Sequence, residues 1–152
     1  MKTILGDITL CEDCVQRDTS FAEAAEVLVA SRGSVIAVVD EDQRVVGLFG
    51  AEEALAGVLP GYVGDLHHTA FATDDANVFS EKAAAVRDQP VEQHAADPVT
   101  VTADTSALHV GGVFLHTELP AIAVVEEGRF VGMLDQADFA RAMLRRAAPG
   151  AA

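Results

Sequence analysis

The sequence lacks the features on which several classes of protein depend. It has no tryptophan, one tyrosine and two cysteines among 152 residues. No apolar run approaches the roughly 20 residues that a membrane-spanning helix needs, and residues 1–7 contain no apolar stretch of the kind found in secretory signals. We therefore expect a cytoplasmic protein that does not bind membranes.

Basic residues are also scarce. Ten Lys and Arg residues stand against 24 Asp and Glu residues, which gives a formal net charge of −14. Proteins that bind nucleic acids need clustered positive charge to neutralise phosphates, and anionic membrane surfaces select for the same charge. The sequence therefore argues against both kinds of partner.

The cysteines form a single CxxC motif, Cys11 and Cys14. A redox-active pair normally has cationic neighbours or a helix N-terminus to lower the thiol pKa, whereas Glu12 and Asp13 lie between these cysteines. No second CxxC motif completes a tetrahedral zinc site within the chain. We interpret both cysteines as reduced thiols near the start of a strand; a metal shared across a dimer is the alternative.

The chain contains an internal repeat, in which one sequence unit occurs twice. Three stretches of the first unit align with three of the second: 17–28 with 103–114 and 35–40 with 121–126 at an offset of 86 residues, and 44–47 with 129–132 at an offset of 85. In the first pair, Asp18-Thr19-Ser20 falls on Asp104-Thr105-Ser106. Upstream, residues 5–8 align with residues 91–94. An internal repeat of this kind indicates two copies of one structural unit.

Each unit predicts the order β-α-β-β-α. The Asp-Thr-Ser cluster is a helix N-cap signal, and the apolar spacing that follows it in the first unit gives one buried helix face. "VIAVV" and "AIAVV" are too short for helices and rich in β-branched residues, so they predict buried strands. Polar turns lead into a further strand and a closing helix, at 51–58 or 136–147.

These elements predict four segments along the chain. The first unit covers 1–59, a connector covers 60–90, the second unit covers 91–147 and a tail covers 148–152. Within the connector, "SEKAAAVRD" predicts a short helix, because a loop of this length without secondary structure is uncommon.

The succession resembles the cystathionine-β-synthase (CBS) domain, and its repetition resembles the tandem CBS pair, or Bateman module. The residues that carry the resemblance are "DPVTVTADTS", "AIAVVEEGRFVG" and "DQADF" in the second unit, and "DTSFAEAAEVL" and "AVVDEDQRVVGLF" in the first. The resemblance implies an α/β (α+β) fold in which two pseudo-symmetric units pack through their sheets. It also implies clefts between the units that hold adenine nucleotides or adenosyl compounds.

In that family the last strand ends in Gly, two apolar residues, Ser or Thr, two more residues and Asp. The second unit keeps the final carboxylate as Asp138 but has Asp135 in the hydroxyl position, and the first unit has Glu53 and Gly50 there. A carboxylate can accept both hydrogen bonds from a ribose diol. Alternatively, Asp135 is an N-cap and Asp138 a first-turn carboxylate, as in a helix that binds nothing.

The resemblance implies ligand contacts in both units. They are Asp138, Asp135, Thr100, Val101 and Ile122 in the second unit, and Glu53, Gly50, Gln16 and Ile36 in the first. The implied ligands are adenosine, AMP, ATP or an adenosyl compound. A phosphate near 5 Å from Asp135 would meet a repulsion of about 3 kcal/mol at an effective dielectric constant of 20. We therefore expect the second unit to prefer a ribose without an adjacent phosphate, and a phosphorylated nucleotide to bind beside Gly50.

No Ser-His-Asp or Cys-His arrangement, phosphate loop or metal motif is evident, so we expect no enzyme. Two functions remain open. The first is a regulatory module that senses an adenosine-containing ligand and controls another protein, which the sequence does not identify. The second is a ligand-free module for oligomerisation or protein interaction.

The helix predicted at 106–116 carries two adjacent glycines, Gly111 and Gly112. Each glycine costs a helix about 1 kcal/mol relative to alanine, and close approach of another helix is the usual reason for such a residue. We therefore expect a homodimer that uses this helix.

Overall fold

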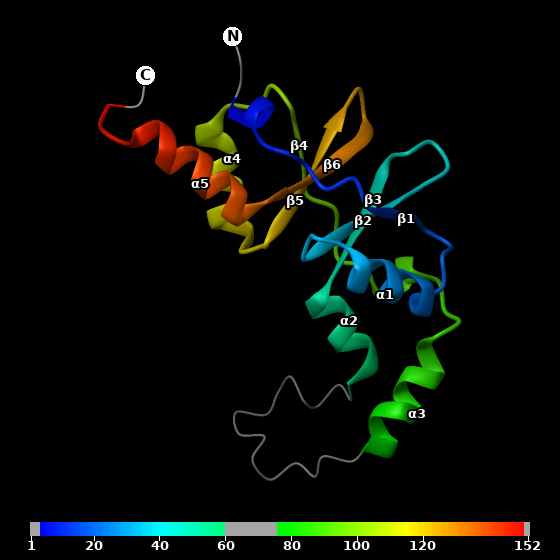
Figure 1. The fold of residues 1–152 in the computed structure, drawn as a ribbon. Helices are drawn as coiled ribbons and strands as arrows, with labels where there is room; N and C mark the ends of the chain where they lie inside the picture. Colours follow the sequence, from blue (N-terminus) through cyan, green and yellow to red (C-terminus); the bar gives the residue numbers. More distant parts are fainter. Residues whose placement is uncertain (1–3, 60–75, 151–152) are drawn as a thin grey trace.

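The computed structural model describes residues 4–59 and 76–150 as two β-α-β-β-α units, side by side (Figure 1). Unit one contains β1 (Cys14–Gln16), α1 (Phe21–Ala30), β2 (Val35–Val39), β3 (Val45–Gly50) and α2 (Ala51–Val58). Unit two contains β4 (Thr100–Thr102), α4 (Ala107–Thr117), β5 (Ala121–Glu126), β6 (Arg129–Asp135) and α5 (Gln136–Ala147). The predicted element order and fold class are confirmed.

Among the described residues, three further helices lie outside these strands and helices. The 3₁₀ helix η1 (Ile4–Asp7) precedes unit one, and η3 (Val91–His94) precedes unit two at nearly the aligned position. The helix α3 (Ala76–Val86) lies in the connector, where the sequence predicts a short helix, although it begins and ends earlier than "SEKAAAVRD". In the part of the chain that the structure describes, no helix combines the length and the apolar character needed to cross a bilayer.

Each unit has a three-stranded sheet, in the order β1-β2-β3 or β4-β5-β6. The first two strands of each sheet are parallel, with Val15 opposite Val38 and Val101 opposite Val124, and the last two are antiparallel. A parallel pair needs a crossover connection, which α1 and α4 supply. Their N-caps are Ser20 and Ser106, each of which accepts a backbone hydrogen bond at 3.2 Å, as the Asp-Thr-Ser clusters predict.

The two sheets pack face to face, and the central strands are buried on both sides. In β2, Ile36 and Val38 pack against the helices of unit one. The alternate residues Val35, Ala37 and Val39 pack against unit two, in a cluster that also contains Leu48, Ala121, Ala123 and Met133. Burial on both faces explains why "VIAVV" and "AIAVV" are continuous apolar runs and show no alternation.

The segment that leads into each unit crosses to the other unit. We call residues 4–11 the first leader and residues 91–96 the second leader. Cys11 exchanges backbone hydrogen bonds of 3.1 and 2.7 Å with Met133 in β6, and Ala96 exchanges bonds of 3.0 and 2.8 Å with Leu48 in β3. Leu5 is buried in the helix-side core of unit two, and Val91 in that of unit one. Each unit therefore completes its core with residues from the other half of the repeat.

Candidate functional site

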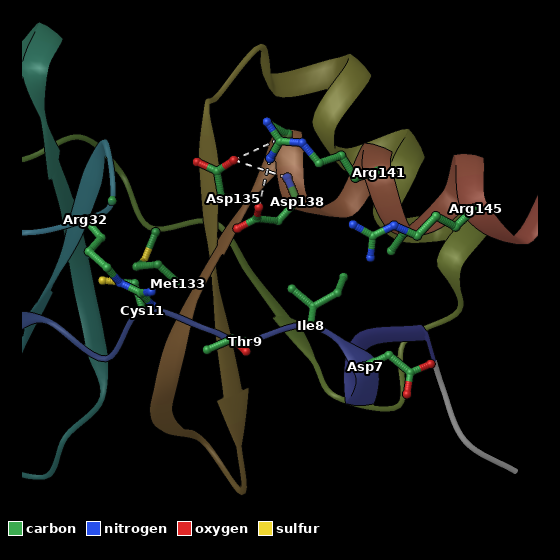
Figure 2. Close-up of a pocket in the computed structure, with 13 residues that line it drawn as sticks. Asp7, Ile8, Thr9, Cys11, Arg32, Met133, Asp135, Asp138, Arg141 and Arg145 are labelled. Carbon is green, nitrogen blue, oxygen red and sulfur yellow. Dashed lines mark hydrogen bonds and ion pairs between the residues drawn. The ribbon is translucent and has the colours of Figure 1, made fainter.

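A cavity of about 550 Å³ opens where β6 ends and α5 begins (Figure 2). Three segments line it: the first leader with Asp7, Ile8, Thr9 and Cys11; the turn between α1 and β2 with Arg32 and Gly33; and β6 with α5, through Met133, Asp135, Ala137, Asp138, Arg141, Ala142 and Arg145. We call this space the β6 cavity. Because of the exchanged leader, both halves of the repeat contribute to its walls.

Asp135 is the last residue of β6 and the N-cap of α5. Its Oδ1 accepts hydrogen bonds from the backbone N–H groups of Ala137 at 2.8 Å and Asp138 at 3.3 Å. The N-cap function considered from the sequence is therefore confirmed, and the negative charge lies at the positive end of the helix dipole. The same residue lines the β6 cavity, so the capping carboxylate also forms part of the cavity wall.

Asp138 lies in the first turn of α5, on the wall of the same cavity. Its Oδ1 accepts a hydrogen bond from Nη1 of Arg141 at 3.0 Å, and half of its side chain is exposed. An ion pair this exposed contributes roughly 0–1 kcal/mol to stability, because water screens it and both side chains lose freedom. Asp138 can therefore exchange part of this contact for a ligand hydroxyl at small cost.

Sequence reasoning missed the three arginines of the cavity, Arg32, Arg141 and Arg145. Figure 2 shows Arg141 beside Asp138, with Arg145 further along the same helix and Arg32 approaching from unit one. The spacing of Arg141 and Arg145 by four residues on a helix placed them on one face, a signal that the sequence offered. Arg32 gave no signal, because its position depends on how the units pack.

These arginines change the charge balance of the cavity. Three carboxylates line it, those of Asp7, Asp135 and Asp138, and they face an equal number of guanidinium groups. The repulsion expected between Asp135 and a phosphate therefore acts together with attraction from the guanidinium groups that line the same cavity. The expected preference for a ribose without phosphate considered only one of these opposing charges.

Three other residues implied for unit two do not reach the cavity. Val101 and Ile122 are 5% and 0% exposed, within the helix-side core of that unit. Thr100 is exposed on β4 and is not among the residues that line the cavity. The physical reason is the geometry of strands, whose successive side chains alternate between the two faces. Val101 and Ile122 lie on the helix side of their sheet, whereas Met133 of the cavity belongs to the cluster between the sheets.

In unit one, the equivalent carboxylate binds its own backbone. Glu53 Oε2 accepts a hydrogen bond from the N–H of Gly50 at 3.1 Å, across the first turn of α2. A β-carbon on Gly50 would lie 2.9 Å from Cγ2 of Val35 and 3.0 Å from the carbonyl oxygen of Ser34. A side chain at position 50 would therefore collide with the start of β2. Gly50 is required by packing.

The remaining residues implied for unit one are also apart from the β6 cavity. Ile36 is completely buried in the helix-side core, and Gln16 is exposed on β1. The two copies of the motif are therefore not equivalent. The carboxylates of unit two face a cavity, whereas the carboxylate of unit one caps a helix.

The two cysteines differ in their surroundings. Cys11 lines the β6 cavity, with its Sγ 3.2 Å from Oδ2 of Asp13 and 3.4 Å from Oγ of Ser31. Burial, and then the charge of Asp13, raise the pKa of the Cys14 thiol, which opposes thiolate formation. Over residues 4–59 and 76–150, no three His, Cys, Asp or Glu side chains gather in a way that could hold a metal ion.

Comparison with known proteins identifies a family with which this chain shares sequence features. A family model for the CBS domain matches the chain twice, at residues 6–59 and 91–145. No protein with a curated description matches the sequence at a significant level.

Several solved structures are similar. A CBS domain-containing protein of unknown function from Kribbella flavida has a TM-score of 0.73 at 20% identity, over 95% of this chain and 99% of that one. The CBS-pair protein CBSX2 from Arabidopsis thaliana has a TM-score of 0.72 at 20% identity, over 97% of this chain and 98% of that one. A further CBSX2 structure, in complex with AMP, has a TM-score of 0.69 at 20% identity, over 97% of this chain and 100% of that one. With both halves of the repeat matched by one family model, the chain belongs to the CBS-domain family and carries a tandem pair of CBS domains.

Proposed function

We propose that the protein is a regulatory module, not an enzyme, that binds an adenosine-containing ligand in the β6 cavity. The observation that carries the proposal is Asp138, a half-exposed carboxylate on the wall of a cavity of about 550 Å³ that also contains arginines. Small-molecule sites usually have volumes of about 300–1,000 Å³. The complex of CBSX2 with AMP supports the choice of ligand class.

Each group of the ligand has a candidate partner in the cavity. Asp138 accepts hydrogen bonds from the ribose diol. A guanidinium group binds phosphate oxygens with two parallel hydrogen bonds, so Arg141 and Arg145 on α5 supply the binding site for a phosphate. Ile8 and Met133 supply apolar surface for the base. We therefore propose a nucleoside monophosphate such as AMP as a better ligand than adenosine.

Calorimetry with adenosine, AMP and ATP tests the proposal. We expect AMP to bind, Asp138→Asn to weaken both AMP and adenosine, and Arg141→Gln to weaken AMP more than adenosine. The matched control is Glu52→Gln, which removes an exposed first-turn carboxylate from the equivalent helix of unit one. Native mass spectrometry of the protein purified from its host would identify a bound nucleotide directly.

The second function is an interaction module without a ligand. If none of the three compounds binds at millimolar concentration, and no small molecule is purified with the protein, the ligand-binding function is wrong. The large apolar side chains exposed on α1, α2, α4 and α5 favour this second function.

A further inference from the structure

The first leader forms one wall of the β6 cavity. Figure 2 shows it running along one side of the cavity, with Ile8 and Thr9 between Asp7 and Cys11. All four of these side chains line the cavity. A ligand that fills the cavity therefore touches a segment that precedes the strands of unit one in the sequence and lies against unit two.

The first leader is attached to unit two at separate points. At one end, Leu5 is 5% exposed within the helix-side core of that unit. At the other end, Cys11 and Met133 form an isolated bridge of two backbone hydrogen bonds. Between these ends, Gly6 and Thr9 are exposed. A segment with so little buried surface opens locally at a lower free energy than the whole fold.

Among the side-chain attachments of the first leader, Leu5 contributes most, because it is the one buried residue in 5–11. Arg146 of α5 also reaches this segment, where its Nη2 donates a hydrogen bond to Oδ2 of Asp7 at 2.9 Å. About half of each side chain in this ion pair is exposed, so water screens it and it adds little. Leu5 is not among the residues that line the β6 cavity. A change at Leu5 therefore alters the attachment of the leader without removing a ligand contact.

The second leader offers a comparison within the same molecule. It has the equivalent bridge, in which Ala96 and Leu48 exchange two backbone hydrogen bonds. Just before it, the carbonyl oxygen of Gln89 accepts a hydrogen bond of 2.8 Å from the N–H of Phe21, at the start of α1. The second leader contributes no residue to the β6 cavity. The two leaders are therefore alike in their pairing with a sheet, and they differ in their relation to the ligand.

We infer that the first leader is a strap over the β6 cavity, and that ligand binding is coupled to the docking of this strap. The docked leader supplies four residues to the cavity wall, and its release removes them. A ligand therefore binds the docked form more tightly, and by reciprocity it holds the leader in place. The inference rests on the proposed function and adds the segment whose position depends on whether the cavity is occupied.

Amide hydrogen exchange followed by NMR tests the strap in the wild-type protein. The N–H groups of Cys11 and Met133 report on the bridge, and the slowest N–H groups of the central strand β5 report on global unfolding. Without ligand, the two reporters should exchange faster than the slowest groups of β5. AMP at about a hundred times its dissociation constant should slow both reporters roughly 100-fold, because the form with a released leader does not bind the ligand.

Two matched variants separate the leaders. Leu5→Ala should speed exchange at Cys11 and Met133 by about 30-fold or more, because a buried leucine is truncated. Val91→Ala truncates the buried residue of the second leader and should leave both reporters unchanged. Circular dichroism should show that both variants are folded.

Three results would contradict the strap. If calorimetry shows that AMP binds and the reporters do not slow, the inference is wrong and the proposed function stands. Reporters as slow as the slowest groups of β5 would also overturn the inference, since the leader would then open only with the whole fold. A wild-type protein that does not bind AMP would overturn both.

Discussion

Gly132 in β6 lies directly against Leu10 of the first leader, so closely that a β-carbon at position 132 would overlap the Leu10 side chain. The equivalent glycine of unit one, Gly47, has the same relation to Ala95 of the second leader, where the added carbon would lie 2.8 Å from Cβ of Ala95. In the sequence, this glycine is the first residue of the motif to which the family resemblance assigns ligand contacts. In the structure it creates the space in which the leader of the other unit crosses the sheet.

Gly132→Ala should therefore destabilise the protein. We expect a loss of about 1–3 kcal/mol in the free energy of unfolding, the usual cost of adding an atom to a filled core. Urea unfolding followed by circular dichroism gives the measurement. Gly6→Ala is the matched control, because a β-carbon there would meet nothing within 4 Å. Equal stability of the two variants would show that the first leader can shift to accommodate the added carbon without loss in the free energy of unfolding.

Asp135→Thr should change ligand preference more than stability. Threonine caps helices almost as well as aspartate, so the N-terminus of α5 keeps a partner for its N–H groups. Removing the negative charge should strengthen binding of AMP by about tenfold to a hundredfold, because a repulsion of about 3 kcal/mol is lost in part. Calorimetry with AMP and adenosine would test this. Adenosine is the internal control, since its affinity should stay constant; an equal gain for both ligands would contradict the electrostatic cause.

His94 in η3 should make folding sensitive to pH. Its ring packs edge-on against Phe21 with 4.9 Å between centroids, and its Nε2 lies 2.8 Å from Oε1 of Gln89. Burial, and then the charge of Lys82, lower the pKa of His94 below the ordinary value of 6.5. The unfolded chain therefore takes up this proton at a higher pH than the folded protein does. The stabilisation is complete above about pH 6.5 and is lost as the pH falls from there toward the folded pKa.

The measurement is the melting temperature of the wild type and of His94→Gln between neutral pH and the range in which carboxylates titrate. The wild type should lose stability as the pH falls through this window, and the variant should lose less. Glu92, whose pKa is lowered by its hydrogen bond with Arg17, contributes only at more acidic pH, below its ordinary 4.5. Identical pH profiles would rule out His94 as the source.

The parts of the fold that depend on local sequence were predictable. The capping serines, Ser20 and Ser106, and the apolar runs of β2 and β5 follow from patterns within a few residues. The repeat itself then indicated that both halves share one fold. Sequence reasoning also identified Asp135 and Asp138, because both belong to a motif that spans the end of a strand and the start of a helix.

The remainder of the site depends on contacts between distant segments. Arg32 reaches the β6 cavity only because unit one packs beside unit two, and the leader that forms another wall is paired with β6 across more than a hundred residues of sequence. Glu53 was placed at a ligand by analogy with Asp138, yet a glutamate has the additional methylene that lets it reach back to the N–H of Gly50. One extra carbon distinguishes the carboxylate that binds the N–H at the start of its own helix from the carboxylate on the cavity wall.

The exchanged leaders also impose an order of events during synthesis. The ribosome releases the helices and strands of unit one well before it makes Val91, the residue that fills the core of that unit. At about 5–20 residues per second, the interval between residues 59 and 91 lasts roughly two to six seconds. Unit two has the opposite relation, since Leu5 is made before every strand and helix of the unit whose core it fills. The nascent chain thus exposes the incomplete core of unit one, whereas Leu5 is already present for the core of unit two. A chaperone that binds apolar segments would have the most time to bind before the second leader emerges.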